Sequence, residues 1–131
     1  MPTPHDRDVT DATRAVIRRY EHDLYNARNL DLVEELLSDP MYRHDAGGDI
    51  TEMSNADCRA RIGGFFRDFE LLEFTTVHLV VEGTLASWTY KLNGTANDGS
   101  QTVLSSIEVF EIIDGKITRV WNAAHTPGPW G

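Results

Sequence analysis

Apolar residues recur every three or four positions in the first part of the chain, the spacing typical of helices that bury one face. Such a stripe from Val16 to Leu24 predicts a helix that begins near Thr10 or Asp11. The preceding residues 1–9 hold two prolines and several charges, so we expect them to form a loose arm. The sequence therefore predicts an amphipathic helix as the first ordered element.

Two more helices are predicted before the pattern changes. A short one carries apolar residues within 32–37 and ends before Pro40, because the residue that precedes a proline disfavours helix. A short strand over residues 41–45 and a glycine-rich turn follow. The third helix begins at Ser54, since Ser54 and Asp57 have the spacing of a capping box.

From Leu72 onward, apolar and polar residues alternate, as they do in strands. Four strands are predicted, at residues 74–81, 85–92, 102–113 and 117–124. Asp114-Gly115, between the last two, is a strong signal for a tight hairpin. This order predicts an α+β fold in which three N-terminal helices pack on one face of a mostly antiparallel sheet.

The predicted strand 102–113 is apolar on both faces. Val103 and Ile107 lie on one face, and Leu104 and Phe110 lie on the other. The helices cover one of these faces. Because the sequence predicts no further helix, we expect a second copy of the chain to cover the other, which makes the protein a homodimer.

The composition narrows the classes of partner. The chain has 131 residues, with 12 Lys+Arg against 21 Asp+Glu, so its formal net charge is −9. Nucleic acids and anionic membranes select basic surfaces, so neither is an expected partner. The single cysteine, Cys58, excludes an internal disulfide. A polar N-terminus and the lack of a long apolar stretch favour a cytoplasmic protein.

Three phrases of the sequence, in their order, resemble the nuclear transport factor 2-like superfamily. "AVIRRYEHDLYNARNLDLVEELLSDP" resembles its first two helices, "MYRHDAGG" the strand and loop that follow, and "IEVFEIIDGKITRVWNAAH" its final hairpin. The superfamily includes ketosteroid isomerases, SnoaL-like polyketide cyclases, scytalone dehydratase and limonene epoxide hydrolase. The resemblance implies a cone, or α+β barrel, with the helices in the concave face of a strongly curved sheet. It implies one domain over residues 10–125 and a tail over 126–131.

The resemblance also implies catalytic roles. In the isomerase branch, a tyrosine of the first helix and an acid on the penultimate strand bind an enolate oxygen, while an aspartate after the second helix moves the proton. The matching positions here are Tyr20, Glu108 and Asp45. SnoaL-like cyclases tend to carry an acid at the end of the last strand, where this chain has His125. Histidine is also a suitable base at neutral pH.

The alternation of side chains gives the expected orientation of several residues. Glu108 shares a face with apolar neighbours, and a buried carboxyl group that stays neutral can donate a hydrogen bond to an oxyanion. His44 and Asp45 point to opposite faces of a regular strand, so only one should line a pocket. Trp121 and His125 should share one face. Tyr25, five positions after Tyr20, should point elsewhere.

Substrate contacts are expected from residues near these four, namely His44, Phe66, His78, Trp88, Tyr90, Ser106, Phe110 and Asn122. No spacing typical of a metal site is present, and no cofactor is expected. We predict a cofactor-independent isomerase or cyclase that removes a proton next to a carbonyl of a hydrophobic polyketide- or steroid-like molecule. The alternatives are a dehydratase of the same fold and a non-catalytic module that binds small apolar ligands or dimerises.

Overall fold

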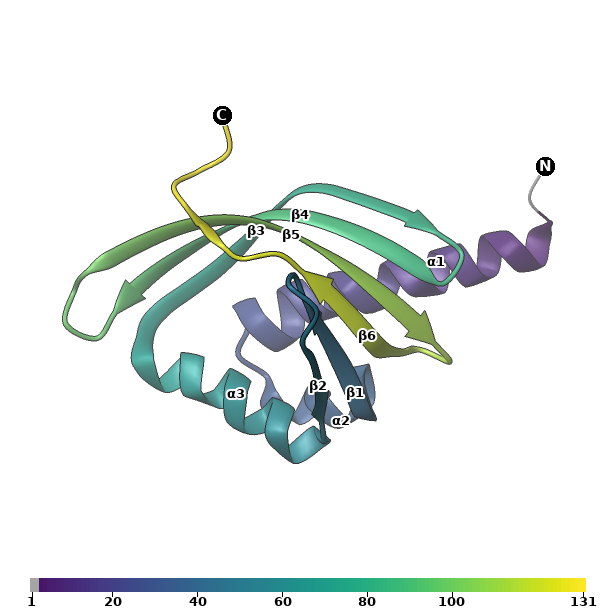
Figure 1. The fold of residues 1–131 in the computed structure, drawn as a ribbon, viewed down its shortest axis with the longest axis horizontal. Helices are drawn as coiled ribbons and strands as arrows, with labels where there is room; N and C mark the ends of the chain where they lie inside the picture. The colour runs from purple at the N-terminus through teal and green to yellow at the C-terminus, as the bar shows by residue number, and fades with distance from the viewer. Residues whose placement is uncertain (1–2) are drawn as a thin grey trace.

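The computed structural model describes residues 3–131, in which helices lie before the first strand and between the second and the third (Figure 1). The helical elements are α1 (Pro4–Arg19), the π-helix η1 (Tyr20–Asn26), the 3-10 helix η2 (Leu30–Leu32), α2 (Val33–Leu36) and α3 (Asn55–Asp68). The strands are β1 (Leu37–Asp45), β2 (Ile50–Met53), β3 (Phe69–Glu82), β4 (Leu85–Ala96), β5 (Gln101–Ile113), β6 (Lys116–Asn122) and β7 (Thr126–Pro127). None of the described helices is long and apolar enough to cross a membrane.

The strands form one curved, open sheet in the order β2-β1-β6-β5-β4-β3, and β7 pairs with β5 beyond the end of β6. Every pair is antiparallel except β1 with β6, which is parallel. The long strands β3, β4 and β5 arch over the helices, which lie on the concave side (Figure 1). The predicted α+β cone with a mostly antiparallel sheet is therefore confirmed, although the sheet does not close.

The core lies between the concave face and the helices. Alternate residues of β4 and β5 point into it, so that Trp88 and Phe110 are almost fully buried. From the helical side, Ile17 and Leu24 are equally buried. The alternation that predicted the strands therefore also places one of their two faces in the core, as expected for a sheet covered by helices.

The N-terminal arm predicted for residues 1–9 is wrong from Thr3 onward, and residues 1–2 lie outside the described part of the chain. The helix α1 begins at Pro4, not near Thr10. Thr3 accepts a hydrogen bond from the backbone N–H of Asp6, and the Asp6 carboxylate accepts one from the backbone N–H of Thr3. This capping box and the proline at the first helical position stabilise the start of α1 at Pro4. The prolines and charges of this segment had instead suggested an arm.

The predicted hairpin at Asp114-Gly115 is confirmed. Both residues have a positive φ, 51° and 79°, as a tight turn between twisted strands requires. The predicted start of the third helix is also confirmed, since the Ser54 hydroxyl accepts a hydrogen bond from Asp57 N–H. The strand β2 was not predicted, and it pairs with β1 across the glycine-rich turn.

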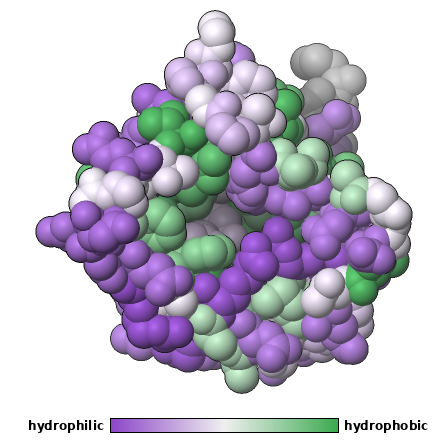
Figure 2. All heavy atoms as spheres, turned by 60° about the vertical axis from the view of Figure 1, so that its left-hand side comes forward, coloured by the Kyte–Doolittle hydropathy of each residue, from purple (hydrophilic) through white to green (hydrophobic). Residues whose placement is uncertain are grey.

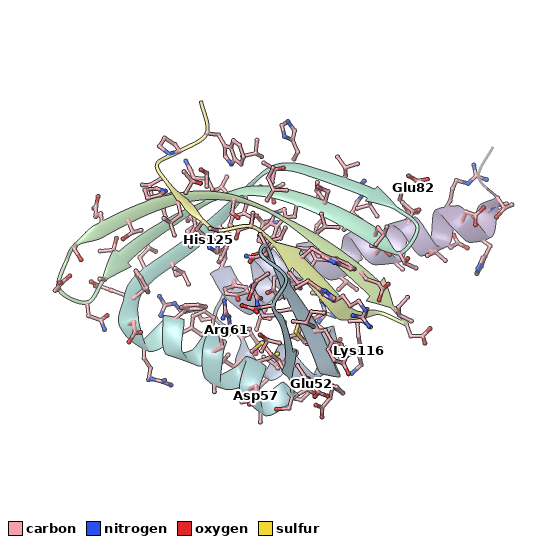
Figure 3. All side chains as sticks on the ribbon, viewed as in Figure 1. Glu52, Asp57, Arg61, Glu82, Lys116 and His125 are labelled. Carbon is pink, nitrogen blue, oxygen red and sulfur yellow. The ribbon has the colours of Figure 1, made fainter. Side chains whose placement is uncertain are left out.

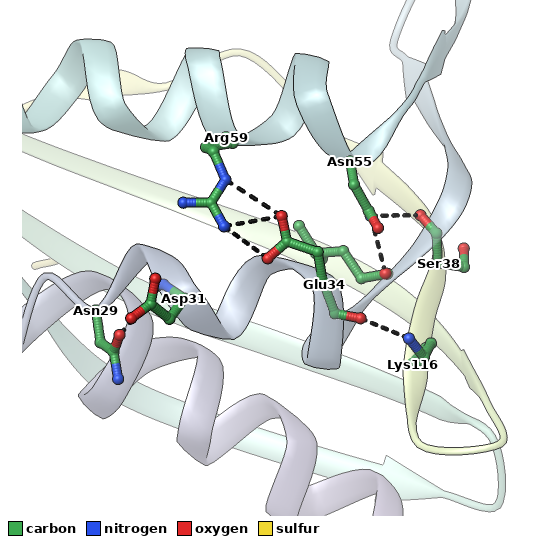
Figure 4. Close-up of polar contacts among 8 residues, drawn as sticks. Asn29, Asp31, Glu34, Ser38, Asn55, Arg59 and Lys116 are labelled. Carbon is green, nitrogen blue, oxygen red and sulfur yellow. Dashed lines mark hydrogen bonds and ion pairs between the residues drawn. The ribbon is translucent and has the colours of Figure 1, made fainter.

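A group of polar contacts on the surface joins α2, α3, β1 and β6 (Figure 4). The Arg59 guanidinium binds both carboxylate oxygens of Glu34, at 2.8 and 2.7 Å. The Lys116 ammonium donates to the Glu34 carbonyl, and the Asn55 amide donates to the Ser38 carbonyl at 3.3 Å. An exposed ion pair stabilises a protein by about 0–1 kcal/mol, so the Arg59–Glu34 pair contributes little to the stability.

Candidate functional site

A cavity of about 240 Å³ lies between the concave face of the sheet and the helices η1 and α3. Its wall is largely apolar and aromatic, formed by Tyr20, Tyr25, Phe65, Phe69, Leu72, Phe74, Trp88, Tyr90, Leu92, Gly94, Thr102 and Leu104. Arg43, Arg61, Glu108 and His125 add the charged and titratable groups. Figure 2 shows a hollow whose rim is hydrophobic on one part and hydrophilic on another. We call this space the main cavity, and its mixture of apolar walls and few polar groups is typical of small-molecule sites.

The π-helix η1 brings two tyrosines into the main cavity. Its hydrogen bonds run between residues five apart, as from Ala27 N–H to the His22 carbonyl at 2.9 Å. Residues five apart then lie near one another, and the Tyr20 and Tyr25 hydroxyl oxygens are 3.5 Å apart. The expectation that Tyr25 points elsewhere is therefore wrong, because it assumed the geometry of an α-helix.

A chain of hydrogen bonds links the end of the sheet to a buried acid. Nε2 of His125 lies 2.8 Å from the Tyr90 hydroxyl, which donates to Oε1 of Glu108 at 3.0 Å. The Asn122 amide donates to the same Glu108 oxygen at 3.2 Å. Glu108 is 7% exposed, whereas His125 is exposed. The chain therefore connects the rim of the main cavity to its interior.

A β-bulge turns His125 into the main cavity. Asn122 pairs with Glu108 and Thr126 pairs with Ser105, so four steps along one strand match three along the other. The extra residue reverses the alternation, and bulges commonly re-aim side chains in this way. The predicted shared face of Trp121 and His125 is wrong for this reason: Trp121 stacks on His44 outside the cavity.

Burial sets the protonation of the three tyrosines. It raises the pKa of Tyr20 well above the usual range, and the nearby Tyr25 and Glu108 raise it further. It also raises the pKa of Tyr25 and that of Tyr90, to which the Glu108 carboxylate adds. Each hydroxyl therefore keeps its proton at neutral pH. Tyr90 donates its proton to Glu108 and Tyr20 donates its proton to Tyr25, which leaves the Tyr25 hydroxyl available as a donor to a ligand.

A second hollow, of about 230 Å³, adjoins the main cavity and shares Arg43, Arg61 and His125 with it. We call it the side hollow. Asp45 lines this hollow and not the main cavity, and its side chain is exposed. The structure therefore brings Tyr20, Glu108 and His125 together in one cavity and places Asp45 beside them.

The predicted substrate contacts separate into two groups. Trp88 and Tyr90 line the main cavity, and Asn122 lines the side hollow. The other five do not line either space. His44 lies 2.9 Å from an Arg119 nitrogen, and His78 is exposed on β3. Phe66 packs on Tyr25, and Phe110 lies in the core against Tyr20. Ser106 is buried and pairs with Tyr90 across the strands.

Among the residues of the main cavity that the predicted site did not include, three are titratable, namely Arg43, Arg61 and Tyr25. Arg43 lies two positions before Asp45, so strand alternation places it on the same face. Arg61 precedes Phe65 and Phe69 at steps of four, the spacing of one helix face, and that signal was present in the sequence. Tyr25 had no comparable signal, because a π-helix is not visible in the pattern.

Among residues 3–131, no three His, Cys, Asp or Glu side chains are close enough to hold a metal ion together. Three titratable groups of the site, those of His125, Tyr90 and Glu108, are hydrogen-bond partners in one chain. This arrangement can transfer a proton at the rim, at His125, and can donate a hydrogen bond from the buried Tyr25 hydroxyl.

The fold and the cavity together define a class of protein. Residues 17–120 match the model of the SnoaL-like domain, so the chain belongs to the SnoaL-like family, within the nuclear transport factor 2-like superfamily. No curated protein sequence matches the chain.

Solved structures of low sequence identity share the fold. A SnoaL-like polyketide cyclase from Agrobacterium tumefaciens has a TM-score of 0.73 and 17% identity, covering 87% of this chain and 91% of its own. An LEH-like epoxide hydrolase from Mycobacterium tuberculosis has a TM-score of 0.74 and 13% identity, with 87% and 83% covered. A ketosteroid isomerase candidate from Kribbella flavida has a TM-score of 0.69 and 23% identity, with 92% and 85% covered. These likenesses show the fold, on which several chemistries occur.

Proposed function

We propose that the protein is a cofactor-independent isomerase or cyclase that removes a proton next to a carbonyl of a compact hydrophobic molecule. The observation that carries this proposal is the chain from His125 through Tyr90 to Glu108 at the rim of an apolar cavity. The volume of about 240 Å³ lies just below the range of ~300–1,000 Å³ for drug-sized ligands. A substrate with one or two rings fits this size better than a steroid.

In this proposal His125 is the base. Tyr90 has a single hydroxyl proton, which it donates to Glu108, so Nε2 of His125 carries the proton between the ring and the Tyr90 oxygen. Nδ1 is then free to accept a proton from the substrate. The resulting imidazolium is stabilised through Tyr90 by the Glu108 carboxylate, as the partner of a catalytic histidine commonly does. Tyr90 and Glu108 are positioning residues in this scheme. Glu108 was expected to bind the enolate oxygen, but its Oε1 accepts hydrogen bonds from Tyr90 and Asn122, so the proposal assigns it to the support of His125.

In the tyrosine pair of η1, Tyr25 donates a hydrogen bond to the substrate oxygen, and Tyr20 supports it by donating to the Tyr25 oxygen. Tyr20 and Tyr25 both line the main cavity, and their raised pKa values keep both hydroxyls protonated. When His125 removes a proton from the carbon next to the carbonyl, negative charge develops on the carbonyl oxygen. Preformed donors in a water-poor cavity stabilise such charge strongly. The proton then returns to another carbon, or the enolate attacks within the same molecule to close a ring.

The proposal includes a homodimer. His78, Thr89 and Ile107 are neighbours across β3, β4 and β5 on the convex face. Ile107 and Val80 on this face are 44% and 65% exposed. Apolar patches of this kind mark interaction surfaces. A second copy of the chain is the occupant that the sequence predicted.

The proposal places the protein in the cytoplasm. Cys58 is a free, buried thiol, and unpaired cysteines suit a reducing compartment.

Isomerisation of a bicyclic β,γ-unsaturated ketone tests the function, because the conjugated product absorbs in the ultraviolet. We expect His125→Gln and Glu108→Gln to lower kcat by about 10²–10⁴-fold, the usual contribution of acid–base groups. His5→Gln, an exposed histidine of α1, is the control and should turn over at the wild-type rate. Asp45→Asn should retain most of the activity.

Two results would contradict the proposal. Wild-type turnover no faster than in buffer, over a panel of one- and two-ring ketones, would remove the enzymatic function. Loss of turnover in Asp45→Asn with retention in His125→Gln would assign the base to Asp45 instead.

A further inference from the structure

Two arginines stand where the main cavity meets the side hollow. Arg43 on β1 and Arg61 on α3 line both spaces. Among residues 3–131 neither makes an ion pair or a side-chain hydrogen bond, although Arg61 also lies over the Phe65 ring at 5.5 Å. Arg59, two positions earlier on α3, is by contrast fully paired with Glu34. Arg61 projects from α3 toward the sheet, on the side where His125 lies (Figure 3).

The charge of this junction is opposite to that of the whole chain. The formal net charge is −9, yet the side hollow has two arginines and one carboxylate, that of Asp45. Asp45 forms no ion pair with either arginine within the described residues, so the two positive charges are not neutralised by contact. The Glu108 carboxylate, deeper in the main cavity, already accepts hydrogen bonds from Tyr90 and Asn122.

The positive charge also reaches the interior. Burial raises the pKa of Tyr25, and the charges of Arg61 and Arg43 act in the opposite direction. Arg43 acts in the same way on Tyr20. A guanidinium carries five N–H donors in a planar fork that matches a carboxylate, so two unpaired guanidinium groups at a cavity mouth form a site suited to that group.

We infer that the substrate is a hydrophobic keto acid, whose carboxylate binds Arg43 and Arg61 while its apolar part, which carries the reactive carbonyl, occupies the main cavity. The inference rests on the proposed function, because it names the substrate class of the same site. The inference also determines the orientation of the substrate in the site. An acid anchored at this junction lies beside His125, which both spaces share, and its rings lie against Trp88 and the tyrosine pair.

Binding of two unreactive probes of the same size separates charge from shape. The probes are 2-naphthoate, which is an anion at pH 8, and 2-acetylnaphthalene, which is neutral, and binding is followed by calorimetry. We expect the wild type to bind 2-naphthoate at least about tenfold more tightly, and increasing salt should reduce this preference. Arg43→Met and Arg61→Met should each lose most of the preference while keeping their affinity for 2-acetylnaphthalene.

Arg59→Met is the matched control, because Arg59 lies on the same helix but is paired with Glu34 outside the cavity. It should bind both probes as the wild type does. Equal affinity of the wild type for the two probes would overturn the inference. Equal weakening of both probes in Arg43→Met and Arg61→Met would also overturn it, since the arginines would then support the shape of the cavity only.

The outcome is independent of turnover because neither probe reacts. A wild type that prefers 2-naphthoate but isomerises no ketone would overturn the proposed function and leave an acid-binding protein. A wild type that isomerises ketones without this preference would overturn the inference and leave the proposed function intact.

Discussion

The Tyr90 hydroxyl oxygen lies 2.8 Å from Nε2 of His125, although the two residues are 35 positions apart in the chain. Tyr90 comes from the middle of β4, and His125 comes from the irregular segment between β6 and β7. The β-bulge after Asn122 makes this contact, because it reverses the alternation and turns His125 inward. A single extra residue in a strand therefore completes the site.

Removing the Tyr90 hydroxyl tests whether this contact positions His125. We expect Tyr90→Phe to lower kcat about 100-fold with little change in KM, since the ring remains while the path from His125 to Glu108 is lost. The same variant should bind 2-acetylnaphthalene like the wild type. Tyr42→Phe, whose ring lies under Arg119 away from the cavity, is the control. An unchanged kcat in Tyr90→Phe would remove the relay from the mechanism.

The stability of the protein should fall at alkaline pH. Burial raises the pKa of Tyr20, Tyr25 and Tyr90 in the folded state, so the folded state holds protons that the unfolded state releases near pH 10. The stability is then fully present below about pH 10 and decreases as the pH rises further. Urea unfolding between pH 9 and pH 11.5 measures this decrease. The free energy of unfolding of Tyr20→Phe should fall by up to ~1.4 kcal/mol less per pH unit than that of the wild type. Identical slopes would contradict the burial of its hydroxyl.

Cys58 should react slowly in the folded protein. The thiol is buried, and burial raises its pKa from about 9 to about 11. The thiolate is the reactive form, so at pH 8 its population is about 100-fold smaller than in the unfolded chain. Labelling with a disulfide reagent should be at least that much slower without denaturant than with it. Fast labelling of the folded protein would show that α3 opens readily.

The convex face of the sheet should mediate dimerisation. Ile107 is 44% exposed at its centre, so Ile107→Lys places a charge where a partner chain would bury it. We expect the wild type to sediment as a dimer and this variant as a monomer. Ile50→Lys, on β2 at the far edge of the sheet, has a more exposed apolar side chain and is the control. A dimer that persists in Ile107→Lys would place the interface elsewhere.

The regular elements could be predicted because their signals are local. Asp114-Gly115 determines a hairpin by backbone preference, and Ser54 with Asp57 determines a helix start. The order of helices and alternating strands then restricts the fold to few arrangements. The strand β2 and the start of α1 were exceptions. At α1, the prolines and charges of the first residues suggested an arm, whereas Thr3 and Asp6 cap a helix.

The direction of a side chain could be predicted from the sequence only where the element is regular. Glu108 follows the alternation of β5 and lies in the cavity as expected. His125 points into the cavity because of the β-bulge, and Tyr25 because of the π-helix. Each irregularity changes the side to which a side chain points, since the bulge adds a residue to the strand and the π-helix has more residues per turn than an α-helix. The extra residue can be recognised only from the pairing of Thr126 with Ser105 on another strand. The sequence around His125 alone therefore does not reveal it.

Neighbouring phenylalanines on α3 offer a last test of the cavity, because Phe65 lines it and Phe66 does not. Phe66 packs on Tyr25 and beneath the Arg28 guanidinium, which makes it a support. Phe65→Ala should weaken binding of 2-acetylnaphthalene about tenfold through lost aromatic contact. Phe66→Ala should instead lower the free energy of unfolding by about 2–4 kcal/mol, with a smaller loss of affinity. The reverse order of affinities would place the ligand on the Phe66 side of α3.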